Sequence, residues 1–288
     1  MKPLSIPVRM VGPGSQPDDD AVLQYLEMPR GMSTFEMPPV PDTADARAMA
    51  QSRELLAGFL QELQGWKPAG RSAGPRMDLA GVPAAALEIT NQMLGEGEVS
   101  IRVNGHRDVH IQESVFAGIW RVRDVAADGT LAGDWLEAGP LPAVALETAQ
   151  AAAEPRFDGL AVPAGAMNSP ALLREIESQC RGWRPGGPAH VINLTLFPMS
   201  PDDHSVLAAA LGSGPVAMIS RGFGNCHITS TRARNVWRVQ YFNSMKTLIL
   251  DTIEVVHVPE EALAAPEDLA DSRTRLAELV EWMSESGG

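Results

Sequence analysis

The hexapeptide Gly65-Trp66-Lys67-Pro68-Ala69-Gly70 returns as Gly182-Trp183-Arg184-Pro185-Gly186-Gly187, 117 residues further along the chain. The same offset aligns residues 53–142 with residues 170–259 without a gap, and 22 of the 90 aligned positions are identical. One offset kept over that distance indicates an internal duplication. The sequence therefore predicts two copies of one structural unit.

The second copy shows most clearly which elements this unit contains. Ser169-Pro170 is typical of a helix start and Gly182 of a helix end, and Ser200-Pro201 and Gly212 bound a second helix in the same way. Short β-branched or alternating runs predict strands at 190–197, 215–221, 225–230, 235–242 and 247–258. Each copy is thus predicted as α-β-α-β-β-β-β, an α+β fold whose helices pack on one face of a mainly antiparallel sheet.

We expect five segments along the 288 residues. The first helix is expected to begin near Asp42 or Thr43, and the early strand of the first copy (72–80) is weaker than its counterpart. The segments are an irregular N-terminal arm (1–42), the first repeat (43–142), a linker (143–168), the second repeat (169–260) and a C-terminal amphipathic helix (261–288).

Composition excludes several classes of protein. The net charge of −13 argues against nucleic acid, because phosphates require a basic surface. No stretch has the roughly 20 apolar residues that a membrane helix needs, and residues 1–20 lack the apolar run of a signal peptide. Two cysteines, Cys180 and Cys226, do not indicate a disulfide framework. We therefore expect a soluble, cytoplasmic protein without membrane insertion.

Residues that carry chemistry are few. Cys226 and His227 are neighbours on a predicted strand, so they point to opposite faces and cannot act as nucleophile and base. His110 and His227 are equivalent across the repeat, which favours one structural position filled twice. No metal motif occurs, and two cysteines cannot supply four cluster thiolates. We expect no catalytic residue, metal or cofactor; the alternatives are a metal or iron–sulfur scaffold using Cys226 and His227, and a hydrolase or transferase.

The copies differ most at polar positions of the second copy. Positions that are identical in both copies are those the shared fold requires, so function is expected where the copies diverge. Arg232 and Arg234, for example, stand where the first copy has Val115 and Ala117. The predicted partner-binding residues are Arg221, Asn225, Arg232, Arg234, Asn235, Gln240 and Asn243.

The second copy also carries a long signature. It comprises Gly222-Phe223-Gly224-Asn225-Cys226-His227-Ile228-Thr229-Ser230-Thr231, then Asn235-Val236-Trp237-Arg238-Val239-Gln240-Tyr241-Phe242-Asn243-Ser244, and finally Leu248-Ile249-Leu250-Asp251-Thr252-Ile253-Glu254-Val255. This signature resembles the C-terminal region of the hydrogenase expression/formation proteins called HupH, HoxQ or HyaF. The first copy departs from it, with Gly105-His106-Arg107-Asp108 in place of Gly222-Phe223-Gly224-Asn225.

The resemblance implies an accessory protein for the maturation of uptake [NiFe] hydrogenases. Such proteins act on the iron–sulfur small subunit precursor as a chaperone before twin-arginine export, with other maturation proteins as further partners. No catalytic residue is attached to the family. An acidic chain would also suit a precursor whose leader carries arginines, which is a hypothesis resting on charge alone.

Overall fold

A computed structural model describes residues 45–67, 74–105, 107–151, 157, 160–222 and 224–285 of the chain; the predicted arm, residues 1–42, lies outside them. The first copy contains α1 (Ala46–Gly65), β1 (Arg76–Asp78), α2 (Ala84–Leu94), β2 (Val99–Asn104), β3 (Asp108–Glu113), β4 (Ile119–Val125) and β5 (Leu131–Ala138). The second contains α4 (Ser169–Gly182), β6 (His190–Asn193), α5 (Pro201–Leu211), β7 (Val216–Ser220), β8 (Asn225–Ser230), β9 (Val236–Phe242) and β10 (Leu248–Val255). Between and after them lie α3 (Ala143–Gln150), η2 (Glu260–Ala262) and α6 (Pro266–Glu285), and η1 (Leu194–Leu196) follows β6.

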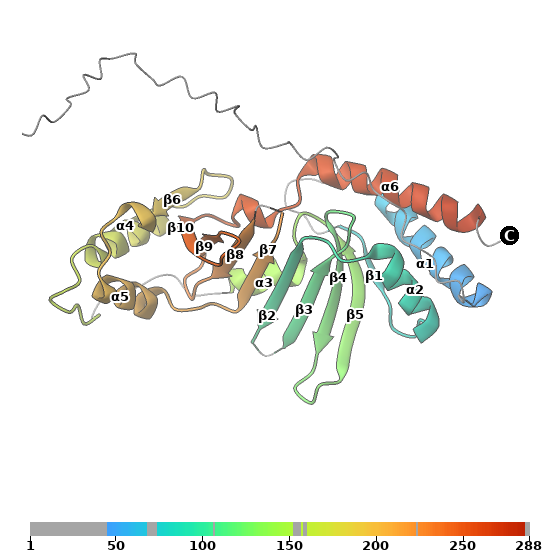
Figure 1. Cartoon of the computed structure of the whole chain (residues 1–288), viewed down its shortest axis with the longest axis horizontal. Helices are drawn as coiled ribbons and strands as arrows, with labels where there is room; N and C mark the ends of the chain where they lie inside the picture. The colour runs from blue at the N-terminus through green and yellow to red at the C-terminus, as the bar shows by residue number, and fades with distance from the viewer. Residues whose placement is uncertain are drawn as a thin grey trace, which may run out of the picture. The chain divides into compact units, whose positions relative to one another are not determined.

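All ten strands form one antiparallel sheet in the order β1-β5-β4-β3-β2-β7-β8-β9-β10-β6 (Figure 1). The order is the same in both copies when it is read outward from the centre. There β2 of the first copy pairs with β7 of the second, from Val99 opposite Ser220 to Val103 opposite Val216. The α+β class and the antiparallel sheet are confirmed, and the predicted order α-β-α-β-β-β-β occurs twice. A duplication as its origin remains a prediction.

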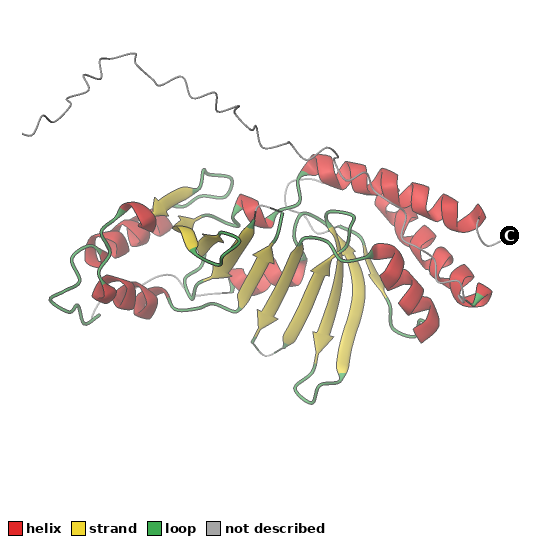
Figure 2. Cartoon of the chain, in the orientation of Figure 1, coloured by secondary structure: helices red, strands yellow, loops and turns green. Residues whose placement is uncertain are grey.

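The helices of each copy lie on one face of the sheet, as predicted, and α3 lies on the other. In the second copy, Ile176 of α4 and Leu207 of α5 pack with Ile253 and Val255 of β10. In the first copy, Asn91 of α2 accepts a hydrogen bond from the guanidinium of Arg121, whose side chain lies on the corresponding face of β4. Figure 2 shows α4 and α5 at one end of the sheet and α1, α2 and α6 at the other.

The opposite face of the central strands is buried under α3 and η2. Ala145 and Ala149 of α3 and Ala262 of η2 belong to the same buried core as Trp120 and Trp237, which hold equivalent positions in β4 and β9. Residues from both copies therefore share one core. On the other face, the described residues leave the central strands uncovered between α2 and α5.

Several element boundaries differ from the sequence prediction; the strand predicted at 190–197, for example, ends at Asn193, where η1 begins. The cap of α1 is Asp45, not Asp42 or Thr43, because its carboxylate accepts the N–H of Arg47 at 3.0 Å. Asn168, not Ser169, is the N-cap of α4. The strand predicted to reach residue 258 ends at Val255, because the chain then turns into η2.

Candidate functional site

Strand register arranges the uncovered side chains in two rows, which we call the open face. Alternation along each strand sends every second side chain to this side. One row contains Arg123, His110, Arg102, Ala217, Thr229 and Arg238, in order from β4 to β9. The other contains Arg121, Gln112, Ser100, Ile219, His227 and Gln240. The two copies contribute equally to this surface.

An equivalent ion pair lies near each end of the open face. Arg121 donates to both carboxylate oxygens of Asp134 at 2.5 and 2.6 Å, and Arg238 donates to both oxygens of Asp251 at 2.9 and 2.6 Å. Both aspartates are buried, and bidentate pairing raises the pKa of Arg238. These four side chains are identical across the repeat and fix the position of each guanidinium.

The centre of the open face is a hollow with a volume of about 430 Å³. Its arginines differ in their contacts: Arg102 donates to both oxygens of Asp108 at 3.0 and 2.8 Å, whereas Arg123 is exposed and has no hydrogen bond or ion pair with another described residue. The hydrogen bond from Arg102, followed by that from His110, lowers the pKa of Asp108. The hollow is lined by Ser100, Ile101, Arg102, His110, Ile111, Gln112, Arg123, Ala217 and Ile219.

Two smaller pockets flank this hollow, one beside α2 and one beside α5. Their volumes are about 210 and 200 Å³. The first is lined by Asn91, Leu94, Gly95, Glu96, Gln112, Ser114, Arg121 and Arg123. Adding 117 to each number gives Ala208, Leu211, Gly212, Ser213, Thr229, Thr231, Arg238 and Gln240, all of which line the second. The two copies thus build the same pocket, with three of the eight positions identical and five different.

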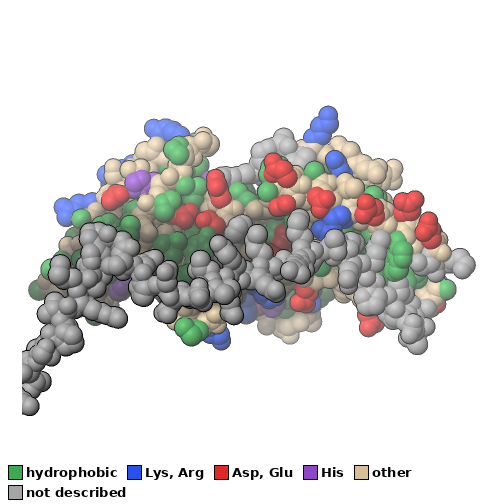
Figure 3. Space-filling view, turned by 45° about the horizontal axis from the view of Figure 1, so that its top comes forward, with side chains coloured by type: hydrophobic (Ala, Val, Ile, Leu, Met, Phe, Trp, Pro, Cys, Tyr) green, Lys and Arg blue, Asp and Glu red, His purple; other side chains and the backbone are tan. Residues whose placement is uncertain are grey.

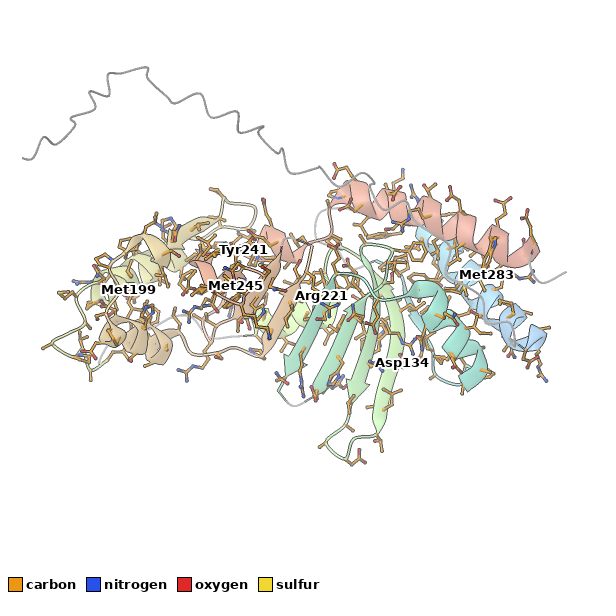
Figure 4. The ribbon with its side chains drawn as sticks, viewed as in Figure 1. Asp134, Met199, Arg221, Tyr241, Met245 and Met283 are labelled. Atoms are coloured by element: carbon orange, nitrogen blue, oxygen red, sulfur yellow. The ribbon has the colours of Figure 1, made fainter. Side chains whose placement is uncertain are left out.

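Three of the seven predicted partner-binding residues belong to this side of the sheet. Gln240 lies in the second row, and Arg221 and Asn225 are exposed where β7 ends and β8 begins. The backbone N–H of Arg221 donates to the carbonyl of Glu98 at 3.1 Å, which places Arg221 beside the first copy (Figure 4). Their partner-binding role remains a prediction.

The other four residues lie in turns, and three have a structural role there. A guanidinium N–H of Arg232 donates to the carbonyl of Ala209 at 3.0 Å and closes the end of α5. Asn235 is buried, with φ of 61° where the first copy has a glycine. Asn243 accepts the N–H groups of Met245 and Thr247 with its side-chain oxygen. The local contacts at these positions differ between the copies, and the partner-binding role of Arg232, Arg234, Asn235 and Asn243 remains a prediction.

The seven residues therefore do not form one cluster. Arg232, Arg234 and Asn235 follow the C-terminal end of β8, whereas Arg221, Asn225 and Asn243 surround its N-terminal end. The sequence argument did not single out Arg102 and Arg123, because it looked for binding residues only in the second copy, and it assigned His110 to a structural position. The signal was present in the pair Arg123 and Gln240, which occupy equivalent positions and diverge.

Cys226 and His227 point to opposite faces, as their adjacency on β8 predicts. Cys226 is buried in the core under α3, and burial raises the pKa of its thiol to about 11. His227 lies on the open face against Phe242, with 4.8 Å between the ring centroids. Three strand spacings, about 14 Å, separate it from His110. The described residues include no group of three His, Cys, Asp or Glu placed to hold a metal ion.

Comparison with known proteins identifies the family. The model of the HupH hydrogenase expression protein, C-terminal conserved region, matches residues 49–157 and 166–283. HoxQ of Cupriavidus necator, a hydrogenase expression/formation protein, is 43% identical over 98% of this chain and 99% of its own. HupH of Rhodobacter capsulatus is 40% identical, over 94% of each chain, and the hydrogenase-1 operon protein HyaF of Escherichia coli is 34% identical, over 96% of each.

A solved structure of hydrogenase expression protein HupH from Thiobacillus denitrificans is 31% identical, with a TM-score of 0.36; the match covers 38% of this chain and 92% of that one. Within the described part of the chain, no helix has the length and apolar character to cross a membrane. The sequence matches extend over nearly the whole chain and include both copies. The chain therefore belongs to the HupH family of hydrogenase expression proteins.

Proposed function

We propose that the protein is a non-enzymatic chaperone in [NiFe] hydrogenase maturation that binds the iron–sulfur small subunit precursor in the cytoplasm. Its relatives are hydrogenase expression and formation proteins, which supports a role in hydrogenase maturation. The observation that carries the binding role is the open face, six strands wide, which the described residues leave uncovered.

The chemistry of this face supports binding in preference to catalysis. Arg121 and Arg238 are held in bidentate ion pairs, and the side-chain amide nitrogen of Gln112 shares its two N–H donors among three backbone carbonyls at 3.1 to 3.2 Å. His110 and His227 are separated by three strand spacings, about 14 Å across the sheet, and stand in different rows. Side chains fixed in this way present hydrogen-bond groups to a partner at a small entropic cost, as a preformed binding surface does.

The alternative is a metal or iron–sulfur scaffold that uses Cys226 and His227. A cluster needs thiolates, but burial keeps the Cys226 thiol protonated at neutral pH and its neighbour faces the other way. A scaffold role would therefore require β8 to leave the sheet.

One experiment separates the two functions. The tagged chain is co-expressed with a hydrogenase small subunit precursor and purified without oxygen, and the product is analysed for subunit, iron and zinc. We expect a stoichiometric complex, and a chain that is colourless and carries no metal when it is purified alone. Recovery of the chain with metal in proportion to it, and without the subunit, would favour the scaffold.

The charge hypothesis concerns a different surface. Acidic side chains gather over α6, which carries Glu267, Asp268 and Asp271 in its first turns (Figure 3). If this surface holds an arginine-bearing leader, a precursor without its arginine pair should bind less tightly at low salt. Equal affinities for the two precursors would show that the arginine pair of the leader does not contribute to binding.

A further inference from the structure

We propose that the hollow of the open face binds an extended partner segment in which a carboxylate lies next to an aliphatic side chain. This inference rests on the proposed function and specifies the chemistry of the segment. It follows from the two sides of the hollow, one from each copy, which differ in character.

The first-copy side of the hollow is basic. It carries Arg102, Arg123 and His110, and no carboxylate lines the hollow. Asp108, at its margin, accepts from Arg102 at 3.0 and 2.8 Å and lies 3.2 Å from Nε2 of His110, so Arg123 is the cation of the hollow that pairs with no described residue. In a chain with a net charge of −13, this is a local reversal of charge, so a carboxylate of the partner is the complementary group.

The second-copy side is apolar. Ala217 and Ile219 stand opposite Arg102 and Ser100 across the seam between β2 and β7, and Ile219 is 41% exposed. Ile219 is also the counterpart of Arg102 at the offset of 117 residues. A symmetric sheet thus presents an arginine on one side of the seam and an isoleucine on the other, which orients a segment that carries one acidic and one aliphatic residue.

The dimensions favour an extended segment. Strands lie about 4.8 Å apart, so the rows from β4 to β9 span about 24 Å, the length of about seven extended residues. The pockets beside α2 and α5, with volumes of about 210 and 200 Å³, lie at the two ends of this path and can each receive a side chain.

A second exposed surface competes for the same role. Met245 and Ile249, in the β9–β10 hairpin and β10, and Leu196 in η1 are 79%, 56% and 78% exposed. Their first-copy counterparts are Asp128, Ala132 and Leu79, of which Leu79 is buried. The exposed Lys246 lies in the same hairpin, so this patch also has a cation, and the cross-linking arm of the test separates it from the hollow.

The test uses the full chain and the small subunit precursor. Arg123→Glu reverses the charge of the hollow without breaking a hydrogen bond or ion pair given for the described residues, and Arg47→Glu makes the same change on an exposed residue at the start of α1. We expect Arg123→Glu to weaken precursor binding about tenfold or more, because it sets a carboxylate against a carboxylate, and Arg47→Glu to leave binding unchanged.

A photo-reactive residue at position 219, compared with one at position 249, locates the segment. We expect cross-links from position 219 to map to one acidic and aliphatic stretch of the precursor, and an Arg substitution of its carboxylate to restore binding to Arg123→Glu. If both charge variants bind the precursor normally and cross-links form only from position 249, the hollow is not the binding site, but the chaperone function still stands. No binding by the unmodified chain would instead overturn the proposed function.

Discussion

At the residue scale, the buried carboxyl groups control how stability depends on pH. Glu254 lies in the sheet and is 7% exposed. Burial, followed by the charge of Glu261, raises its pKa from 4.5 to about 7. The folded protein thus holds this proton more tightly than the unfolded chain, so the stabilising contribution is complete below about pH 4.5 and is lost as the pH rises towards 7.

Glu254→Gln should therefore stabilise the protein only at neutral and alkaline pH. We expect the free energy of unfolding to rise by roughly 1–3 kcal/mol at pH 8 and to remain unchanged at pH 4, because glutamine keeps the acceptor for Thr252 without a charge. Denaturant titrations at pH 4, 6 and 8 check this, with Glu278→Gln on the exposed face of α6 as control. An equal gain at all three pH values would contradict the assigned titration.

Asn235 and its first-copy counterpart, Gly118, form the same turn with different residues. The φ of 61° at Asn235 matches the 76° of Gly118. Asn235→Gly should leave the unfolding free energy nearly unchanged, whereas Asn235→Ala should lower it by about 1 kcal/mol, because alanine tolerates a positive φ poorly. A thermal unfolding series compares the two variants. If both bind the small subunit precursor as the unmodified chain does, Asn235 has no role in recognition.

At the element scale, most of the fold could be predicted from local pattern. The helix and strands predicted at 200–212, 215–221, 225–230 and 235–242 correspond to α5 (Pro201–Leu211), β7 (Val216–Ser220), β8 (Asn225–Ser230) and β9 (Val236–Phe242). The caps and the alternating pattern that predict these four elements lie within each segment, so the sequence of the segment alone was enough to predict them. The end of β10 and the short η1 and η2 helices were missed, because they depend on contacts with distant segments.

The start of α5 shows a predicted cap with an added function. Ser200 and Asp203 form the predicted helix start as a capping box. Asp203 also accepts the N–H groups of Asn168 and Ser169 at 2.9 and 2.8 Å, which ties α5 to the start of α4. Burial opposes its ionisation, but the N–H donors of Ser169, Ser200 and Asn168 outweigh it and bring the pKa well below its ordinary value.

Asp203→Ala should therefore cost more than the loss of a helix cap. We expect the free energy of unfolding to fall by roughly 2–4 kcal/mol, because two helix starts lose their acceptor. Asp202→Ala is the matched control, since it removes the neighbouring charge from the same helix turn but no acceptor of α4. Chemical denaturation at pH 7 measures both, and equal losses in the two variants would contradict this role.

At the scale of the whole molecule, the sequence could not decide whether the copies form one body or two. Nothing in the alternation of 99–104 or 216–220 distinguishes an edge strand from one that pairs with another copy. The structure joins them through β2 and β7 and gives them one core, which includes Val103, Met218, Trp120 and Trp237. The candidate site could not be predicted for the same reason, because its hollow exists only where the two copies meet.

A shared sheet and core predict that the two copies unfold together. Met218→Ala, at the seam, should lower the free energy of unfolding by roughly 2–5 kcal/mol. Hydrogen exchange followed by mass spectrometry across a denaturant series should show β4 and β9 losing protection at one midpoint, which shifts as a unit in the variant. Separate midpoints for the two copies would show that they are independent.

The central claim is that this chain holds its partner and does not transform it. The most direct measurement titrates the purified chain against a fixed amount of small subunit precursor, without oxygen, and follows how much precursor stays soluble. A chaperone protects one precursor per binding site, so we predict that protection rises linearly and reaches its plateau at one chain per precursor. Full protection at one chain per hundred precursors would identify a catalyst and contradict the claim.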